Sequence, residues 1–104
     1  MADFGDRVRI KASDETLELE LAGREGEVYG WTTPSITGVT VVGSEEDDVA
    51  LNVNIEGLEH DLWFHPDLVE LIDHNPGMTV SINGMDGEAV RLPNGEWQER
   101  SRSK

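Results

Sequence analysis

The chain has 104 residues, so we expect one domain, or a small domain with an appendage. It has no cysteine, which excludes disulfides and thiolate zinc sites. It has no apolar run as long as a membrane helix, so we expect an intracellular protein without a membrane partner. Its 22 acids and 8 bases give a net charge of −14, and no Lys or Arg lies between Arg24 and Arg91. Because nucleic-acid affinity depends on Lys and Arg that displace phosphate counterions, we do not expect the body of the chain to bind DNA or RNA.

The dominant periodicity of the first segments is two, which is typical of β-strands. Residues 7–11 alternate polar and apolar side chains, and residues 17–21 do the same, with three leucines inward and two glutamates outward. Alternation favours a strand or an extended loop arm for residues 17–21, and a helix that starts after Ser13 or Asp14 is the alternative. A turn then leads into residues 25–30.

The middle of the chain predicts two strands separated by a charged loop. Residues 32–35 are expected to form a loop with Pro34 as the breaker, and the β-branched residues 38–43 a short strand. Residues 44–48 read as a charged hairpin loop, and residues 49–55 as the clearest strand. In that strand the alternation places Val49, Leu51, Val53 and Ile55 inward and Ala50, Asn52 and Asn54 outward.

A short apolar run, a tight turn and a further strand follow, at residues 62–64, 65–67 and 68–72. Many short strands at regular spacing, Gly-rich turns and no convincing helix together predict an all-β protein, built as a small barrel or sandwich.

Residues 73–77 are the best boundary in the sequence, because Asn, Pro and Gly together stop helices and strands. They divide the chain into a β-barrel at residues 1–73 and an extension at residues 74–104 whose local charge is balanced. The extension is a predicted β-hairpin region with hairpin turns at Asn83-Gly84 and at residues 93–95, and its end from Ser101 is expected to fray. Its predicted strands are residues 78–82, 87–92 and 96–98. It could pack on the barrel, start a second barrel or donate an edge strand to another chain.

Two segments resemble a known fold. Residues 4–10 (FGDRVRI) and 21–28 (LAGREGEV) resemble the opening of KOW-like and other SH3-like barrels, with G-D-x-V-x-V followed by G-x-x-G-x-V. Residues 63–70 (WFHPDLVE) are similar to the turn and last strand of such barrels, the mind-bomb type of SH3-like repeat included. The resemblance spans residues 4–73 and implies a small SH3-like barrel, a fold and not a ligand.

Aromatic side chains suggest a partner-binding surface. Tyr29, Trp31, Trp63 and Phe64 could form a half-exposed aromatic shelf of the kind that captures extended peptides. Strand parity places Tyr29 and Trp31 on one face and Val28 on the other, so a buried Val28 would leave both aromatics available. The alternative is that they cap an open end of the barrel.

The other chemically distinctive residues favour binding over catalysis. The acids Glu45, Glu46, Asp47 and Asp48 lack the alternating spacing of a calcium loop, so a solvated acidic tip is predicted and no metal or cofactor is expected. His60, His65 and His74 show no metal-binding spacing, and no activated nucleophile is recognisable, so we expect no enzyme. His65, which precedes Pro66, is interpreted as a turn residue whose ring packs or hydrogen-bonds locally.

We therefore expect a non-catalytic protein-interaction module that binds a protein partner through Tyr29, Trp31, Trp63 and the acids of residues 45–48. An acidic inhibitor or immunity-type protein that blocks a basic, nucleic-acid-processing enzyme is one alternative, and a structural accessory subunit of an enzyme complex is another. The net negative charge has two possible explanations: it forms an acidic face for a basic partner, or it keeps the protein soluble, as in proteins adapted to high salt. The inhibitor alternative predicts tight binding to a basic enzyme that weakens strongly with added salt, whereas binding that survives high salt would favour the aromatic shelf.

Overall fold

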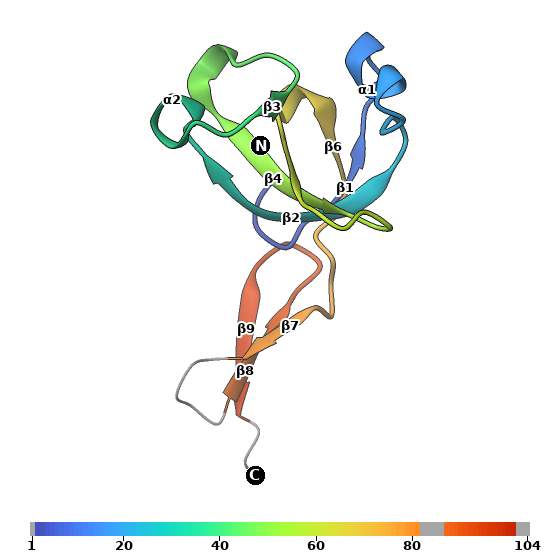
Figure 1. Cartoon of the computed structure of the whole chain (residues 1–104). Helices are drawn as coiled ribbons and strands as arrows, with labels where there is room; N and C mark the ends of the chain where they lie inside the picture. The colour runs from blue at the N-terminus through green and yellow to red at the C-terminus, as the bar shows by residue number, and fades with distance from the viewer. Residues whose placement is uncertain (1, 82–86, 102–104) are drawn as a thin grey trace. The chain divides into compact units, whose positions relative to one another are not determined.

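The structure, a computed structural model, describes residues 2–81 and 87–101 and consists mainly of β-strands, so the predicted all-β class is confirmed (Figure 1). The chain divides into two compact units, Met1–Ile72 and Asp73–Lys104, which we call the N-terminal and C-terminal units. Among the described residues, no helix is both long and apolar enough to cross a membrane.

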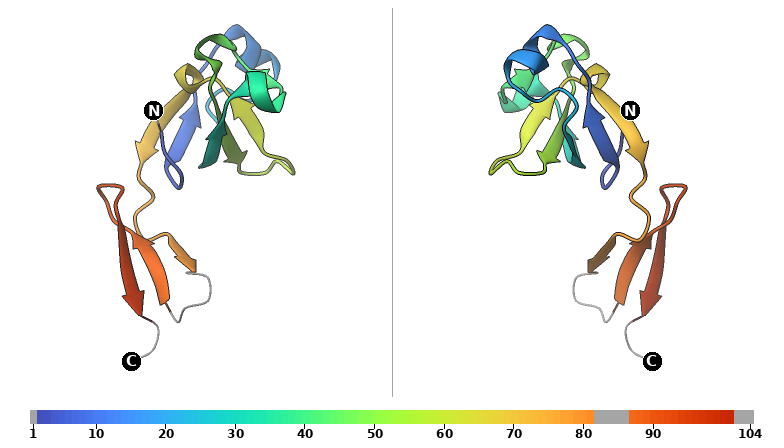
Figure 2. Two further views of the ribbon diagram at one scale, coloured as in Figure 1. Left: turned by 90° about the vertical axis from the view of Figure 1, so that its left-hand side faces the viewer. Right: turned by 90° about the vertical axis from the view of Figure 1, so that its right-hand side faces the viewer.

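The N-terminal unit is built on one six-stranded sheet with the strand order β3-β5-β4-β2-β1-β6. The end strands β3 and β6 are not paired with each other, so the sheet does not close into a complete barrel. Figure 2 shows the short helical segments of this unit gathered toward one end of the sheet. The elements are β1 (Arg7–Ile10), α1 (Asp14–Glu18), β2 (Glu25–Thr32), α2 (Pro34–Thr37), β3 (Val41–Val42), the 3₁₀ turn η1 (Glu46–Asp48), β4 (Ala50–Ile55), β5 (Leu62–Phe64), the 3₁₀ turn η2 (Pro66–Leu68) and β6 (Val69–Asp73).

The core of this unit is a cluster of aliphatic side chains around one phenylalanine. Strand β4 contributes alternate residues to it, as predicted, and Ala50 is also buried although it was expected to face outward. Val49 precedes the strand and is only partly buried. The cluster consists of Val8, Ile10, Leu21, Val28, Val42, Leu51, Val53, Ile55, Phe64 and Val69.

The predicted strand at residues 17–21 is wrong, because its first two residues belong to the capped helix α1 and the rest form a turn that leads out of it. The Ser13 hydroxyl accepts the Thr16 amide and the Thr16 hydroxyl accepts the Ser13 amide, so α1 begins with a reciprocal capping box. Leu17 and Leu19 are exposed and only Leu21 reaches the core. The capping hydrogen bonds at Ser13 therefore outweigh the period-two pattern, because the leucines at positions 17 and 19 that make this pattern are exposed to solvent.

The segment between β2 and β4 also differs from the prediction. Strand β2 runs on to Thr32, and Pro34 begins α2, since proline fits the first position of a helix. The strand predicted at residues 38–43 shrinks to β3, which pairs in parallel with β5 and not with β4. Residues 44–48 are consequently a crossover loop and not a hairpin tip, because their flanking strands are not partners.

Strand β2 carries a β-bulge that changes which face its residues occupy. Val28 pairs with Val53 and Gly30 with Asn52, which leaves Tyr29 as an extra residue without a partner in the ladder. Beyond Tyr29, side chains of β2 therefore point to the opposite face from the one that simple alternation predicts.

The C-terminal unit is a three-stranded antiparallel sheet formed by β7 (Thr79–Ser81), β8 (Gly87–Arg91) and β9 (Trp97–Ser101). The predicted turn at residues 93–95 is confirmed, with the Gly95 amide donating to Leu92 O at 2.9 Å and a φ of 92° at Gly95. The other predicted turn, Asn83-Gly84, and the end of the chain after Ser101 lie outside the described residues.

Two glycines of β2 allow a matched test of the sheet. A Cβ at Gly26 would overlap the backbone carbonyl of Asn54, whereas nothing lies within 4 Å of a Cβ at Gly30. We expect Gly26→Ala to lower the free energy of unfolding by about 1–3 kcal/mol, because the β2–β4 backbones would have to separate. Gly30→Ala should be neutral or stabilise by up to about 1 kcal/mol. Urea denaturation measures both, and equal effects of the two substitutions would contradict the described packing.

Candidate functional site

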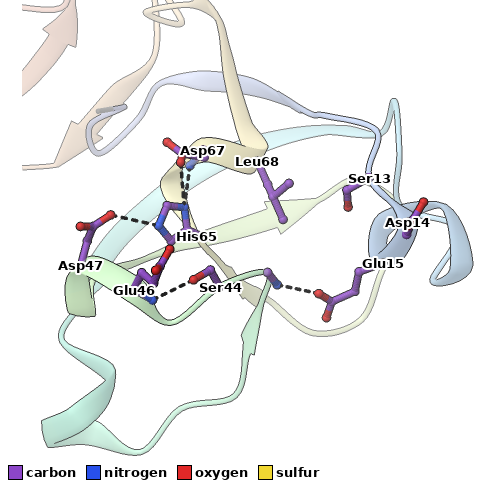
Figure 3. Close-up of a pocket in the computed structure, with 10 residues that line it drawn as sticks. Ser13, Asp14, Glu15, Ser44, Glu46, Asp47, His65, Asp67 and Leu68 are labelled. Atoms are coloured by element: carbon purple, nitrogen blue, oxygen red, sulfur yellow. Dashed lines mark hydrogen bonds and ion pairs between the residues drawn. The ribbon is translucent and has the colours of Figure 1, made fainter.

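An acidic groove lies where three segments of the N-terminal unit meet (Figure 3). Its volume is about 510 Å³, and it is open to solvent on one side. One wall is the start of α1, the second is the loop from β3 through η1, and the third is the segment from β5 through η2. The lining residues are Ser13, Asp14, Glu15, Gly43, Ser44, Glu46, Asp47, His65, Asp67 and Leu68.

The charge of this acidic groove is all of one sign. Five of the lining side chains are carboxylates, and none is Lys or Arg. The ion pairs found among the described residues join groove carboxylates only to His65, whereas Arg7 and Arg9 pair elsewhere, with Glu25. Five carboxylates on the lining of one groove, with no Lys or Arg among them, create a negative potential that favours a positively charged ligand.

His65 forms the floor of the groove and is 6% exposed. Its Nδ1 accepts the Asp67 amide at 3.0 Å, and its Nε2 lies 3.4 Å from Asp47 Oδ2. The interpretation of His65 as a locally hydrogen-bonded turn residue is therefore confirmed. Because both ring nitrogens are engaged by the chain itself, the imidazole joins η1 to η2 across the groove.

Further hydrogen bonds fix the walls. Glu15 Oε1 accepts the backbone amide of Gly43 at 2.9 Å, which links α1 to the segment after β3. The Ser44 hydroxyl accepts the Glu46 amide at 2.9 Å and so shapes the start of η1. The backbone amides of Gly43 and Glu46, which are outside the strand ladders, thus have side-chain acceptors.

The acidic loop is held in an uncommon backbone conformation. Asp47 and Asp48 have φ values of 67° and 51°, in the left-handed region that Asp tolerates better than most residues do. Asp48 is anchored by two hydrogen bonds from Ser35, and Asp47 lies against His65. Of the acids predicted at residues 45–48, Glu46 and Asp47 line the groove, while Glu45 is exposed and Asp48 contacts α2.

The aromatic shelf does not form as predicted. Trp31 pairs with Leu51 and Leu51 with Phe64, whereas Trp63 pairs with Asn52. Because residues paired across a sheet share a face, Trp31 and Trp63 project to opposite sides. Phe64 is 0% exposed and belongs to the core.

The bulge at Tyr29 explains this error. Alternation along residues 28–31 puts Val28 and Trp31 on opposite faces, but the extra residue Tyr29 brings both to the same face. Trp31 nevertheless stays exposed, because it lies near the end of β2 and is not part of the core cluster. Tyr29 itself is about half exposed.

Comparisons with protein-family models, with curated proteins and with solved structures found no match to this chain. Within the described residues, no three His, Cys, Asp or Glu side chains are grouped closely enough to hold a metal ion. His60 is exposed, and neither it nor His74 lines the groove.

Sequence reasoning missed Asp14, Glu15 and Asp67 as members of the site. They come from segments that lie some fifty residues apart and meet only in the folded chain. The one local signal was the possible helix start at Ser13, which places the two acids of its first turn together.

His65 gives a test of the groove floor. Replacing it with Leu keeps most of the side-chain volume but removes the acceptor for the Asp67 amide, which should cost about 1–2 kcal/mol of unfolding free energy. Hydrogen exchange of the Asp67 amide should also accelerate. His60→Leu, on an exposed histidine, is the control and should leave both quantities unchanged. An unaltered Asp67 exchange rate in the His65 variant would contradict the described hydrogen bond.

Proposed function

We propose that this protein is a non-catalytic protein-interaction module whose N-terminal unit binds a basic segment of a protein partner in the acidic groove. The observation that carries the proposal is that five carboxylates, from three segments, line a groove that contains no Lys or Arg. A Lys or Arg side chain of the partner would supply the missing cation and form charge-assisted hydrogen bonds with these carboxylates.

The size and rigidity of the groove support this proposal. A volume of about 510 Å³ accommodates one or two side chains of an extended segment. Glu15 links the first wall to the second, and the contact of His65 with Asp47 links the second wall to the third, so little ordering is required when a partner binds. Loops carried on a sheet commonly hold binding residues in this way.

The proposed fold family is that of SH3-like barrels. Strand β6 returns to lie beside β1, and β5 leads into it through the 3₁₀ turn η2, which agrees with the turn and last strand suggested by residues 63–70. The sheet stays open between β3 and β6, and Glu15 reaches across from α1 to Gly43 at the β3 side.

An acidic inhibitor of a basic enzyme is the second candidate function. Residues 1–72 contain 17 acids and 4 bases, a net charge of −13, whereas residues 73–104 contain 5 acids and 4 bases, a net charge of −1. Such concentration of charge in one unit would accelerate association with a basic surface. This candidate differs from the first in using the whole acidic face and not one groove.

Amide chemical shifts distinguish the two functions. We expect a basic peptide of Arg, Lys, Gly and Ser, titrated into the full chain at about 0.1 M salt, to shift amides of the three groove walls selectively. Replacing Glu46 by Gln and Asp47 by Asn removes two groove charges with nearly unchanged shape, and should weaken peptide binding about 10-fold.

The matched control is Glu56→Gln with Glu59→Gln, which removes two exposed charges outside the groove. It should leave the peptide affinity within about 2-fold, since exposed charges contribute little each. Equal weakening by both double variants, with shifts spread over all acidic surfaces, would move the assignment to the acidic inhibitor. No binding by the wild-type chain would overturn the groove function.

A further inference from the structure

The two most exposed large apolar side chains of the described residues lie close together in the chain. Ile36 is 82% exposed and Trp31 is 62% exposed. Single exposed apolar residues are common on protein surfaces, but tryptophan is enriched where proteins bind partners. We call these two residues the Trp31–Ile36 patch.

The patch is held by a well-defined turn. The Ile36 amide donates to Thr33 O at 2.9 Å, and the hydroxyls of Thr32 and Thr37 lie 3.1 Å apart, so α2 folds back on the end of β2. Pro34 is buried at the first position of α2. A side chain presented by such a fixed turn loses little conformational freedom on binding.

The loop η1 connects the patch to the acidic groove. The Ser35 amide and hydroxyl donate to the Asp48 carboxylate at 2.9 and 2.5 Å, so α2 is bound directly to η1. The two residues before Asp48 line the groove. Figure 1 shows α2 beside the loop between β3 and β4, and Figure 3 shows the same loop forming a wall of the groove.

We propose that the partner segment is bipartite, with a Lys or Arg that enters the acidic groove and an aromatic or aliphatic anchor that packs on the Trp31–Ile36 patch. This inference rests on the proposed function and adds a second contact surface and a sequence requirement for the partner. The segment would cross η1 between its two contacts.

Charge complementarity identifies this occupant. The groove is lined by five carboxylates and by no Lys or Arg, and Asp48, which binds Ser35 of α2, is a further acid next to the patch segment. A second copy of this chain would bring another unit with a net charge of −13 and be repelled. Binding of an apolar segment with basic neighbours would be favoured by the burial of Trp31 and Ile36 and by the negative potential of the groove carboxylates.

Selection from a random peptide library displayed on phage tests the inference with the full chain at physiological salt. We expect wild-type protein to enrich peptides that contain both Lys or Arg and an aromatic or aliphatic residue. Replacing Trp31 and Ile36 by Ser should weaken an enriched peptide about 10- to 100-fold, the loss typical of one or two anchor contacts. The control replaces Phe4 and Leu71, two other exposed apolar residues, by Ser, and should leave the affinity unchanged.

The remaining outcomes separate the two proposals. Two outcomes would overturn the bipartite proposal and leave the groove function unaffected. One is enrichment of basic peptides without an apolar preference. The other is equal peptide affinity for the wild-type chain and the Trp31/Ile36 variant. Failure to enrich basic peptides at all would overturn the proposed function together with this inference. A loss caused by unfolding is recognised from the amide spectrum, and Trp31→Phe with Ile36→Val then repeats the test with smaller changes.

Discussion

Strand β2 approaches β4 so closely that only a hydrogen atom fits between Gly26 and the Asn54 carbonyl. The same stretch of the β2–β4 pair matches Val28 with Val53, and the bulge at Tyr29 then brings Trp31 opposite Leu51. The register in turn decides which side chains of both strands enter the core and which remain at the surface. The loops that follow β2 and precede β4 are positioned by the same pairing, so the acidic groove and the Trp31–Ile36 patch both depend on it.

The open edge of the sheet is the second constraint. Strands β3 and β6 are not paired, and side chains serve as acceptors for backbone amides close to both, Glu15 for the Gly43 amide after β3 and His65 for the Asp67 amide before β6. Both side chains line the acidic groove. The carboxylates around that groove create a negative potential that favours a cationic ligand.

The 3₁₀ turn η1 is central to both proposed contact surfaces. Loop η1 contacts α2 through Asp48 and contacts His65 through Asp47, so one short turn takes part in both proposed contact surfaces. Its positive φ values are uncommon for residues other than glycine, and tertiary contacts hold them. A partner segment that spans both surfaces would be recognised by apolar packing and by charge together, which gives more specificity than either alone.

Local patterns in the sequence predicted much of the sheet. The alternation in β1 and β4, the turn before β9 and the local role of His65 follow from contacts between near neighbours, where periodicity and turn chemistry are sufficient. At residues 17–21 two local signals competed, and the capping hydrogen bonds at Ser13 outweighed the alternation.

The candidate site was harder to predict, because its geometry depends on one bulge and on an unpaired edge. The extra residue Tyr29 reverses the face of Trp31 and separates it from Trp63, and the isolated Gly30 is the one local sign of a bulge in residues 28–31. Likewise, nothing local brings Asp14 to Asp67. The sequence by itself determined the all-β class and the acidity. The tertiary structure alone decided where the acids converge, because only long-range strand pairing sets the positions of distant loops.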